Sequence, residues 1–231
     1  MVGDESGSGG VANRKATQRP FFKPVSLSPR LALLAVNLAA GPIGNGPVID
    51  AMTGTGGFIL EAAATNRQAL GIDLNSQMVE GSNQNLNWLL KQQKISESSA
   101  KIVRGDATNI AASIDKSWVG QVRGFVLDPP YGRNSQGSLN HNDLLTKTLT
   151  SAHQVASNKA NLVLIVPIDS MPAQINSALD NNSQVDLLHG DWDSLQQLMK
   201  TSGWQIKNRW IEHVHGSLSR LVIHSEYVPL N

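Results

Sequence analysis

The fold is decided by Val48-Ile49-Asp50-Ala51-Met52-Thr53-Gly54-Thr55-Gly56-Gly57, a short apolar run that ends in a glycine-rich turn. An apolar helical pattern, Phe58-Ile59-Leu60-Glu61-Ala62-Ala63, follows directly. A strand, a glycine turn and a helix in this order let a ligand approach the backbone closely at the carboxyl end of the strand. The spacing differs from G-x-G-x-x-G, so the pattern is only weak evidence for a dinucleotide. A ligand without a pyrophosphate does not need the third glycine.

Outward from this turn, short apolar runs alternate with helical patterns, which is typical of an α/β protein whose parallel sheet is covered on both faces. Strands are predicted at residues 48–51, 69–73, 101–104, 124–128, 161–167, 204–213 and 220–227. Helices are predicted between Ser28-Pro29 and Gly41-Pro42 and at residues 57–66, 76–91, 141–158, 171–181 and 191–201. The last two strands lie too close in sequence for an intervening helix. We therefore expect a seven-stranded, mostly parallel sheet with a C-terminal antiparallel hairpin.

Composition and charge narrow the class of protein. The chain has 231 residues, 40% of them hydrophobic, a formal net charge of +1 and no cysteine. These values fit one sizeable domain without disulfides or thiolate metal sites, and they show no strong charge footprint for nucleic acid. Residues 1–18 are rich in Gly and Ser and are expected to form a flexible tail, so the domain is expected to span residues 19–231. No apolar run is long enough for a membrane span, and a soluble, cytoplasmic protein is expected.

Three acidic residues follow three successive predicted strands. Asp50 ends the first strand, Asp73 ends the second 19 residues after Gly54, and Asp106 follows the third. The spacing of Asp73 is close to that of an acid that meets ribose hydroxyls, and Asp106 could accept a hydrogen bond from an adenine amine. Each acid alone could equally be a solvated strand end or a helix cap. Together they suit a ligand with an amino group, a ribose and an adenine, namely S-adenosylmethionine.

A second motif, Asp128-Pro129-Pro130-Tyr131-Gly132-Arg133, follows the predicted strand 124–128. An exocyclic amine on a nucleobase is a poor nucleophile, because its lone pair is delocalised into the ring. The Asp128 carboxylate and the carbonyl of Pro129 could accept its two N–H protons, and Pro130 stiffens the backbone between them and Tyr131. The ring of Tyr131 offers a plane on which a base can stack. The motif therefore predicts methylation of a planar nitrogen, although an ordinary proline turn after a strand would also fit.

With these residues, the chain resembles the archaeal tRNA guanine-10 N2-methyltransferases, a family of class I, Rossmann-like methyltransferases that use S-adenosylmethionine. Five segments carry the resemblance: residues 19–39, 50–63, 71–86, 128–133 and 213–220. Two features depart from the family. Ala51 stands where members usually have Pro, and only about 18 residues precede Arg19, where members carry an RNA-binding region with a THUMP domain.

The resemblance implies transfer of a methyl group to N2 of a tRNA guanosine that is flipped out of its stack. The implied catalytic residues are Asp128, Pro129, Pro130 and Tyr131. The implied cofactor-binding residues are Asp50, Thr53, Gly54, Gly56, Asp73, Leu74, Asp106, Ala107 and Asp128. The implied substrate-binding residues are Tyr131, Gly132, Arg133 and Arg220. The implied partners are tRNA and either a separate RNA-docking module or a small zinc-binding activator protein.

Other functions remain open at this stage. Asp-Pro-Pro-Tyr also occurs in enzymes that methylate guanine N2 of ribosomal RNA or adenine N6 of DNA. The chain could instead be a non-catalytic subunit that binds S-adenosylmethionine, although such a subunit would not need the acceptor pair. Arg133 and Arg220 could contact phosphate or be ordinary solvated arginines. His213 and His215 share one face of a strand, but no third ligand is evident and no metal is expected.

Overall fold

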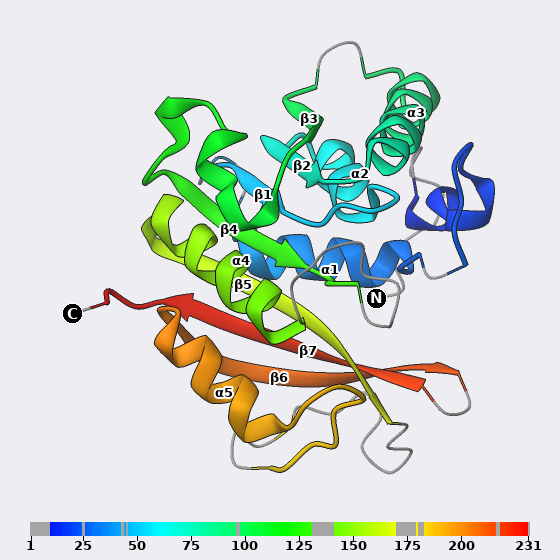
Figure 1. Cartoon of the computed structure of the whole chain (residues 1–231). Helices are drawn as coiled ribbons and strands as arrows, with labels where there is room; N and C mark the ends of the chain where they lie inside the picture. Colours follow the sequence, from blue (N-terminus) through cyan, green and yellow to red (C-terminus); the bar gives the residue numbers. More distant parts are fainter. Residues whose placement is uncertain are drawn as a thin grey trace.

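A computed structural model describes residues 10–24, 26–42, 44, 46–95, 98–130, 141–169, 179, 183–215 and 218–230. A seven-stranded sheet runs through it in the order β3-β2-β1-β4-β5-β7-β6 (Figure 1). The strands are β1 (Val48–Asp50), β2 (Ala69–Asp73), β3 (Ala100–Arg104), β4 (Val122–Leu127), β5 (Ala156–Asp169), β6 (Trp204–His215) and β7 (Leu218–Tyr227). Strands β1 to β5 pair in parallel, and β7 is antiparallel to both β5 and β6. The predicted α/β sheet with its C-terminal antiparallel hairpin is confirmed.

Helices cover both faces of the sheet (Figure 1). On one face, α1 (Pro29–Ala40), α2 (Gly57–Ala64) and α3 (Ser76–Gln92) bury their apolar side chains against the strands. On the other face lie α4 (His141–Val155), α5 (Trp192–Thr201) and the 3-10 helix η3 (Ala107–Ala112). A second short 3-10 helix, η4 (Lys116–Trp118), precedes β4. None of the helices in the described part of the chain is both long and apolar enough to cross a membrane.

The first helix shows how local sequence sets these boundaries. The Ser28 hydroxyl accepts a hydrogen bond from the amide of Leu31 at 3.2 Å, and Pro29 occupies the first helical position. Gly41 ends the helix with a φ of 63°, in the left-handed region that favours glycine. The start and end predicted from the sequence are confirmed.

Several predicted boundaries differ from the structure by one or two residues, and the largest differences lie between α4 and β5. The structure ends α4 at Val155 and starts β5 at Ala156, whereas the sequence pattern continued the helix to residue 158 and started the strand at 161. Ala156 pairs with Val122 at the beginning of β4, so the polar residues that follow Ala156 belong to strand β5 rather than to the helix. The predicted helix 171–181 lies outside the described residues, apart from residue 179.

The segment before α1 is also more ordered than expected. Residues 1–18 were expected to be flexible, but Val11–Arg14 and Ala16–Gln18 form two short 3-10 helices, η1 and η2. Arg14 is buried and forms an ion pair with Glu61 of α2. The described part of this segment, residues 10–18, therefore packs on the domain through a charged contact that its Gly- and Ser-rich surroundings did not indicate.

The strand order places one reversal point at the centre of the sheet. From β1 the chain continues outward to β2 and β3, then returns to add β4 on the other side of β1. In open α/β sheets, ligands bind at the carboxyl edge beside such a reversal. The β6–β7 hairpin reaches the same edge, because Leu218 at the start of β7 pairs with Asp169 at the end of β5.

Candidate active site

The turn between β1 and α2 is built for close approach to its backbone. Gly54 and Gly56 have φ angles of 50° and 85°, where side chains with a Cβ atom are disfavoured. A Cβ atom on Gly56 would also lie only 3.1 Å from Cβ of Ser82. Helix α2 starts at Gly57 without a side-chain cap. The turn therefore presents backbone amides and the positive end of a helix dipole at the reversal point.

The structure brings three of the predicted acids together. Asp50, Asp73 and Asp128 follow or end the neighbouring strands β1, β2 and β4, and the charges of Asp73 and Asp128 both act on the carboxyl of Asp50. Asp73 is held in place because Oδ2 accepts from the amide of Gly54 and Oδ1 from that of Asn75, each at 2.9 Å. One carboxyl thus ties the glycine turn to the end of the second strand.

Asp50 has the most unusual environment of the three. It is fully buried, and burial raises its pKa to about 8, against the opposing effects of the Thr53 hydroxyl and of a hydrogen bond from the amide of Met52. Its Oδ2 atom is buried and has no hydrogen-bond partner among the described residues. A buried carboxyl oxygen of this kind is costly unless a ligand donates to it, and a cationic donor would satisfy it best.

Asp128 lies one residue beyond β4 and is followed by Pro129 and Pro130, while Tyr131, Gly132 and Arg133 lie outside the described residues. Burial raises the pKa of Asp128 to about 6, and the positive charge of Arg220 acts in the opposite direction. The group therefore remains mostly ionised at neutral pH and can accept a hydrogen bond.

Arg220 reaches this site from the C-terminal hairpin. It pairs with Pro167 of β5 on one side and with Glu212 of β6 on the other. Burial raises the pKa of Glu212, and the charge of Arg220 again opposes the rise. Arg220 thus acts electrostatically on Asp128 and Glu212. The sequence singled out Arg220 as a substrate contact but did not single out Glu212.

The remaining predicted cofactor residues line the same edge near β2 and β3. Leu74, directly after Asp73, exposes 56% of its surface. Asp106 is exposed and caps η3, because its Oδ1 atom accepts from the amide and the hydroxyl of Thr108, each at 2.8 Å. Ala107 is buried at the first position of that helix. The cofactor-binding roles of Leu74, Asp106 and Ala107 remain predictions.

Asn85 of α3 lies in one of the segments that carry the family resemblance, but the sequence did not predict its structural role. Its Oδ1 atom accepts from the amide of Phe21 at 2.9 Å, and its Nδ2 atom donates to the carbonyls of Phe21 at 2.8 Å and Thr55 at 2.9 Å. Gly81, one turn earlier, lies so close to the Phe21 ring that an added Cβ atom would be 2.3 Å from it. Asn85 and Gly81 therefore fix the segment before α1 against the glycine turn.

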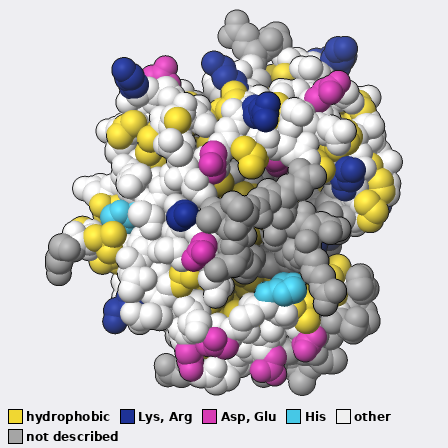
Figure 2. Space-filling view, viewed as in Figure 1, with side chains coloured by type: hydrophobic (Ala, Val, Ile, Leu, Met, Phe, Trp, Pro, Cys, Tyr) yellow, Lys and Arg dark blue, Asp and Glu magenta, His cyan; other side chains and the backbone are white. Residues whose placement is uncertain are grey.

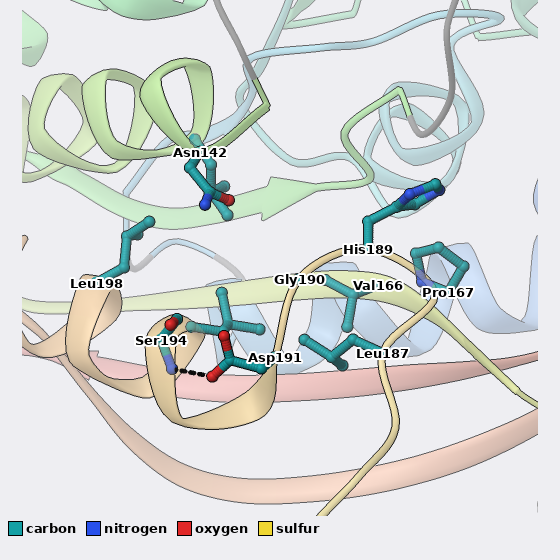
Figure 3. Close-up of a pocket in the computed structure, with 11 residues that line it drawn as sticks. Asn142, Val166, Pro167, Leu187, His189, Gly190, Asp191, Ser194 and Leu198 are labelled. Carbon is teal, nitrogen blue, oxygen red and sulfur yellow. Dashed lines mark hydrogen bonds between the residues drawn. The ribbon is translucent and has the colours of Figure 1, made fainter.

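A small cavity of about 40 Å³ lies away from these acids, between α4, the end of β5 and α5 (Figure 3). Asn142, Pro167, Leu187, His189 and Leu198 are among its walls, and Asp191 beside it caps α5 by accepting from the amide of Ser194 at 2.8 Å. None of the predicted site residues lines it.

The surface agrees with the low net charge. Figure 2 shows Lys and Arg side chains scattered singly over one face, without a basic patch among the described residues drawn there. Exposed acids, among them Asp186, Asp191 and Asp193, lie in and before α5. This view offers no electrostatic footprint of the kind that binds nucleic acid by itself.

Comparison with known proteins gives the family of the chain and supports its fold. Residues 16–198 match the family described as RMKL-like, methyltransferase domain. The chain belongs to this family. It is 29% identical over 207 residues to the tRNA (guanine(10)-N2)-dimethyltransferase of Pyrococcus abyssi. The matched region covers 90% of this chain and 52% of that enzyme. The enzyme of the same name from Methanothermobacter thermautotrophicus is 28% identical, over 89% of this chain and 50% of its own length. The chain thus spans about half the length of these curated relatives.

Solved structures support the fold of this methyltransferase-domain family. TrmN from Thermus thermophilus superposes with a TM-score of 0.59 at 18% identity, over 89% of this chain and half of that one. A SAM-dependent methyltransferase from Methanosarcina mazei gives a TM-score of 0.54 at 12% identity, over 80% of this chain and 94% of that one. At these identities the likeness establishes the Rossmann-like methyltransferase fold.

Proposed function

We propose that this domain uses S-adenosylmethionine to methylate N2 of a guanosine in tRNA, at position 10 as in the names of its relatives. The observation that carries the proposal is that Asp50 and Asp128 lie at the carboxyl ends of the paired parallel strands β1 and β4, beside the central reversal of the sheet. One carboxyl belongs to the glycine turn and the other opens the Asp-Pro-Pro motif, so a cofactor side and an acceptor side meet there.

The residues at the glycine turn fit the cofactor. The buried, unsatisfied Oδ2 atom of Asp50 suits the ammonium group of the methionyl part. Hydrogen bonds from Gly54 and Asn75 orient the carboxylate of Asp73, which in this proposal accepts from the ribose hydroxyls. Asp106 and Leu74 are the proposed adenine contacts. When bound, S-adenosylmethionine supplies an electrophilic methyl group on a sulfonium.

Asp128 is the acceptor-side residue in this proposal. Its carboxylate and the carbonyl of Pro129 accept the two N–H groups of guanine N2 and aim the nitrogen lone pair at the methyl carbon. As the carbon–nitrogen bond forms and the carbon–sulfur bond breaks, N2 loses one proton, which Asp128 accepts. Because the electrophile is already activated, orientation supplies much of the catalysis. The roles of Tyr131 in stacking, of Gly132 and Arg133 in substrate contact, and of base flipping remain part of the proposal.

Docking of the tRNA is proposed to depend on more than this domain. The net charge of +1 and the scattered basic side chains argue that phosphate contacts come largely from another module or from a small activator protein. Arg220 would add a local contact at the acceptor side. The cytoplasm, where tRNA is processed, is the proposed location.

A substrate panel tests this function. The domain is incubated with S-adenosylmethionine carrying a labelled methyl group and with unmodified tRNA transcripts, a ribosomal RNA fragment or duplex DNA, and the products are digested and identified by mass spectrometry. N2-methylguanosine or N2,N2-dimethylguanosine from tRNA is the expected product. N2-methylguanosine from ribosomal RNA alone, or N6-methyladenine from DNA, would replace the proposed substrate. Cofactor binding without transfer to any of them would favour a non-catalytic subunit.

A further inference from the structure

A row of charged side chains crosses the C-terminal half of the sheet beside Asp128. Strands β5, β7 and β6 lie side by side there (Figure 1). Arg220 of β7 pairs with Glu212 of β6, and Asp128 directly follows β4, which pairs with β5. The charge of Arg220 acts on the carboxyls of both Asp128 and Glu212. Among the described residues, Arg220 nevertheless forms a direct ion pair with neither acid.

The three side chains of this row lie on the same face of the sheet. Side chains alternate between the two faces along a strand. The residues two positions before Asp128, two after Arg220 and two before Glu212 all pack in the apolar cluster on the α1 side: Val126, Val222 and Trp210. The residues directly beside the charged ones pack in the cluster on the other face: Leu127, Leu221 and Ile211. The charged row therefore faces the α1 side.

Glu212 is the member of the row with an unsatisfied atom. The residue is half-buried, and its Oε2 atom is buried without a hydrogen-bond partner in the described part of the chain. A buried carboxyl oxygen is unfavourable unless a donor reaches it. The positive charge of Arg220 favours the ionised form of Glu212, which can only accept hydrogen bonds. A substrate with an N–H group would supply the missing donor.

The spacing of the two acids suits a flat base between them. Strands β4 and β6 are three strand positions apart in the sheet. At about 4.8 Å for each step, their backbones are separated by about 14 Å. This separation is too large for the carboxyls of Asp128 and Glu212 to contact each other. It is close to the combined length of two acidic side chains with one edge of a purine between them.

We propose that Glu212 accepts a hydrogen bond from N1–H of the target guanine and thereby selects guanine over other bases that carry an amine. The inference rests on the proposed function, in which Asp128 and the carbonyl of Pro129 engage the N2 amine on the same edge of the base. Bases that are taken out of their stack are recognised by hydrogen bonds to this edge. Guanine carries a hydrogen on N1, whereas N1 of adenine presents a lone pair, which a carboxylate repels.

The test compares two tRNAs that differ only in the target base. One carries guanosine at the methylated position. The other carries 2-aminopurine riboside, introduced by ligation, which keeps the N2 amine but lacks O6 and has a lone pair instead of a hydrogen at N1. The kcat/KM for methyl transfer to each is measured by mass spectrometry of the digested products. The wild type is expected to prefer guanosine by at least about 100-fold, because the carboxylate would be left without its donor.

Glu212→Gln separates recognition of N1 from the other differences between the two bases. The amide has nearly the shape of the carboxyl group, and it can donate to the N1 lone pair of 2-aminopurine. The preference for guanosine should fall by at least about 10-fold, and part of this fall should come from faster transfer to 2-aminopurine. A purely structural role of Glu212 would slow transfer to both tRNAs alike and leave the preference unchanged.

Glu226→Gln is the matched control on the same hairpin. Glu226 of β7 forms an ion pair with Lys207 at 3.2 Å and pairs with Asn161 of β5, far from the carboxyl edge. This variant should keep the wild-type preference. If Glu212→Gln does not fold, as judged by circular dichroism, Glu212→Asp replaces it. This change keeps the charge but withdraws the acceptor by one methylene, so transfer to guanosine should slow by at least about 10-fold, with no change for 2-aminopurine.

The outcomes separate this inference from the proposed function. A wild-type protein that methylates both tRNAs equally, or a Glu212 variant that keeps the full preference, overturns the N1 assignment and leaves the proposed function intact. A wild-type protein that transfers no methyl group to the guanosine tRNA contradicts the proposed function, and the inference fails with it. Loss of preference in Glu226→Gln as well would trace the effect to loosening of the hairpin, which also overturns the assignment.

Discussion

Replacing Asn85 with Ala should weaken cofactor binding as well as the fold. The change removes three buried hydrogen bonds, two to the backbone of Phe21 and one to the carbonyl of Thr55, with lengths of 2.8 to 2.9 Å. Each is worth about 0.5–1.5 kcal/mol net, and buried partners left unsatisfied cost more, so the free energy of unfolding should fall by about 2–4 kcal/mol. Once the segment before α1 is no longer fixed to the turn, the dissociation constant for S-adenosylmethionine should rise by about 10-fold, or about 1.4 kcal/mol.

Asn83→Ala provides the matched control on the same helix. Asn83 donates to the carbonyls of Val79 at 2.9 Å and Ile102 at 3.2 Å, and neither bond involves Phe21 or the glycine turn. Both substitutions make the same change in helix propensity, which therefore cancels in the comparison. Urea unfolding and calorimetry on both variants decide the matter. If Asn83→Ala weakens cofactor binding as much as Asn85→Ala does, or if Asn85→Ala binds like the wild type, Asn85 has no specific role in fixing the segment.

Four further results are expected. The pKa of Asp50 is about 8 in the folded protein, well above the ordinary value of 3.8, so between these two pH values the folded state holds one proton more than the unfolded state. The free energy of unfolding should therefore fall as the pH rises from about 4 to about 8. Urea unfolding of Asp50→Asn should show a flatter dependence on pH. A cationic ligand favours the ionised form, so S-adenosylmethionine binding below pH 8 should release a proton, which calorimetry in buffers of different ionisation enthalpy detects; no difference between buffers would contradict an ammonium site at Asp50. The pKa of Asp128 is about 6 because burial raises it while the charge of Arg220 opposes the rise. Arg220→Gln removes that charge, so the acidic limb of the pH–rate profile should move to higher pH, and an unmoved limb would exclude Asp128 as its source. Gly81→Ala places a methyl group against the Phe21 ring and should raise the cofactor dissociation constant by about 10-fold or more, whereas unchanged binding would mean that the ring moves without consequence.

Local sequence determined much of the fold. Strand β2 was predicted with its observed bounds, because an apolar run stands between polar residues, and α1 was predicted from its Ser-Pro start and Gly end. The start of β5 was missed because its first residues, which include Ser157, Asn158 and Lys159, continue the pattern of the preceding helix. Only pairing with β4, more than 30 residues earlier, makes them a strand.

For the site, too, some residues could be predicted from the sequence and others could not. Asp50, Asp73 and Asp128 could be predicted, because the ends of parallel strands must meet at one edge. The contacts of Arg14 with Glu61 and of Asn85 with Phe21 could not, since they join residues 47 and 64 positions apart and no periodic pattern links them. Arg14 was in addition placed in an expected flexible tail, where polar composition concealed a buried ion pair.

The central claim is that Asp128 serves methyl transfer to guanine N2 of tRNA. The most direct measurement is the yield of N2-methylguanosine from an unmodified tRNA transcript, compared between the wild type and Asp128→Ala after both are shown to be folded and to bind S-adenosylmethionine. The account predicts N2-methylguanosine from the wild type and at least about a 100-fold lower rate from the variant, the range for a lost general base. A folded Asp128→Ala with nearly full turnover would contradict the account.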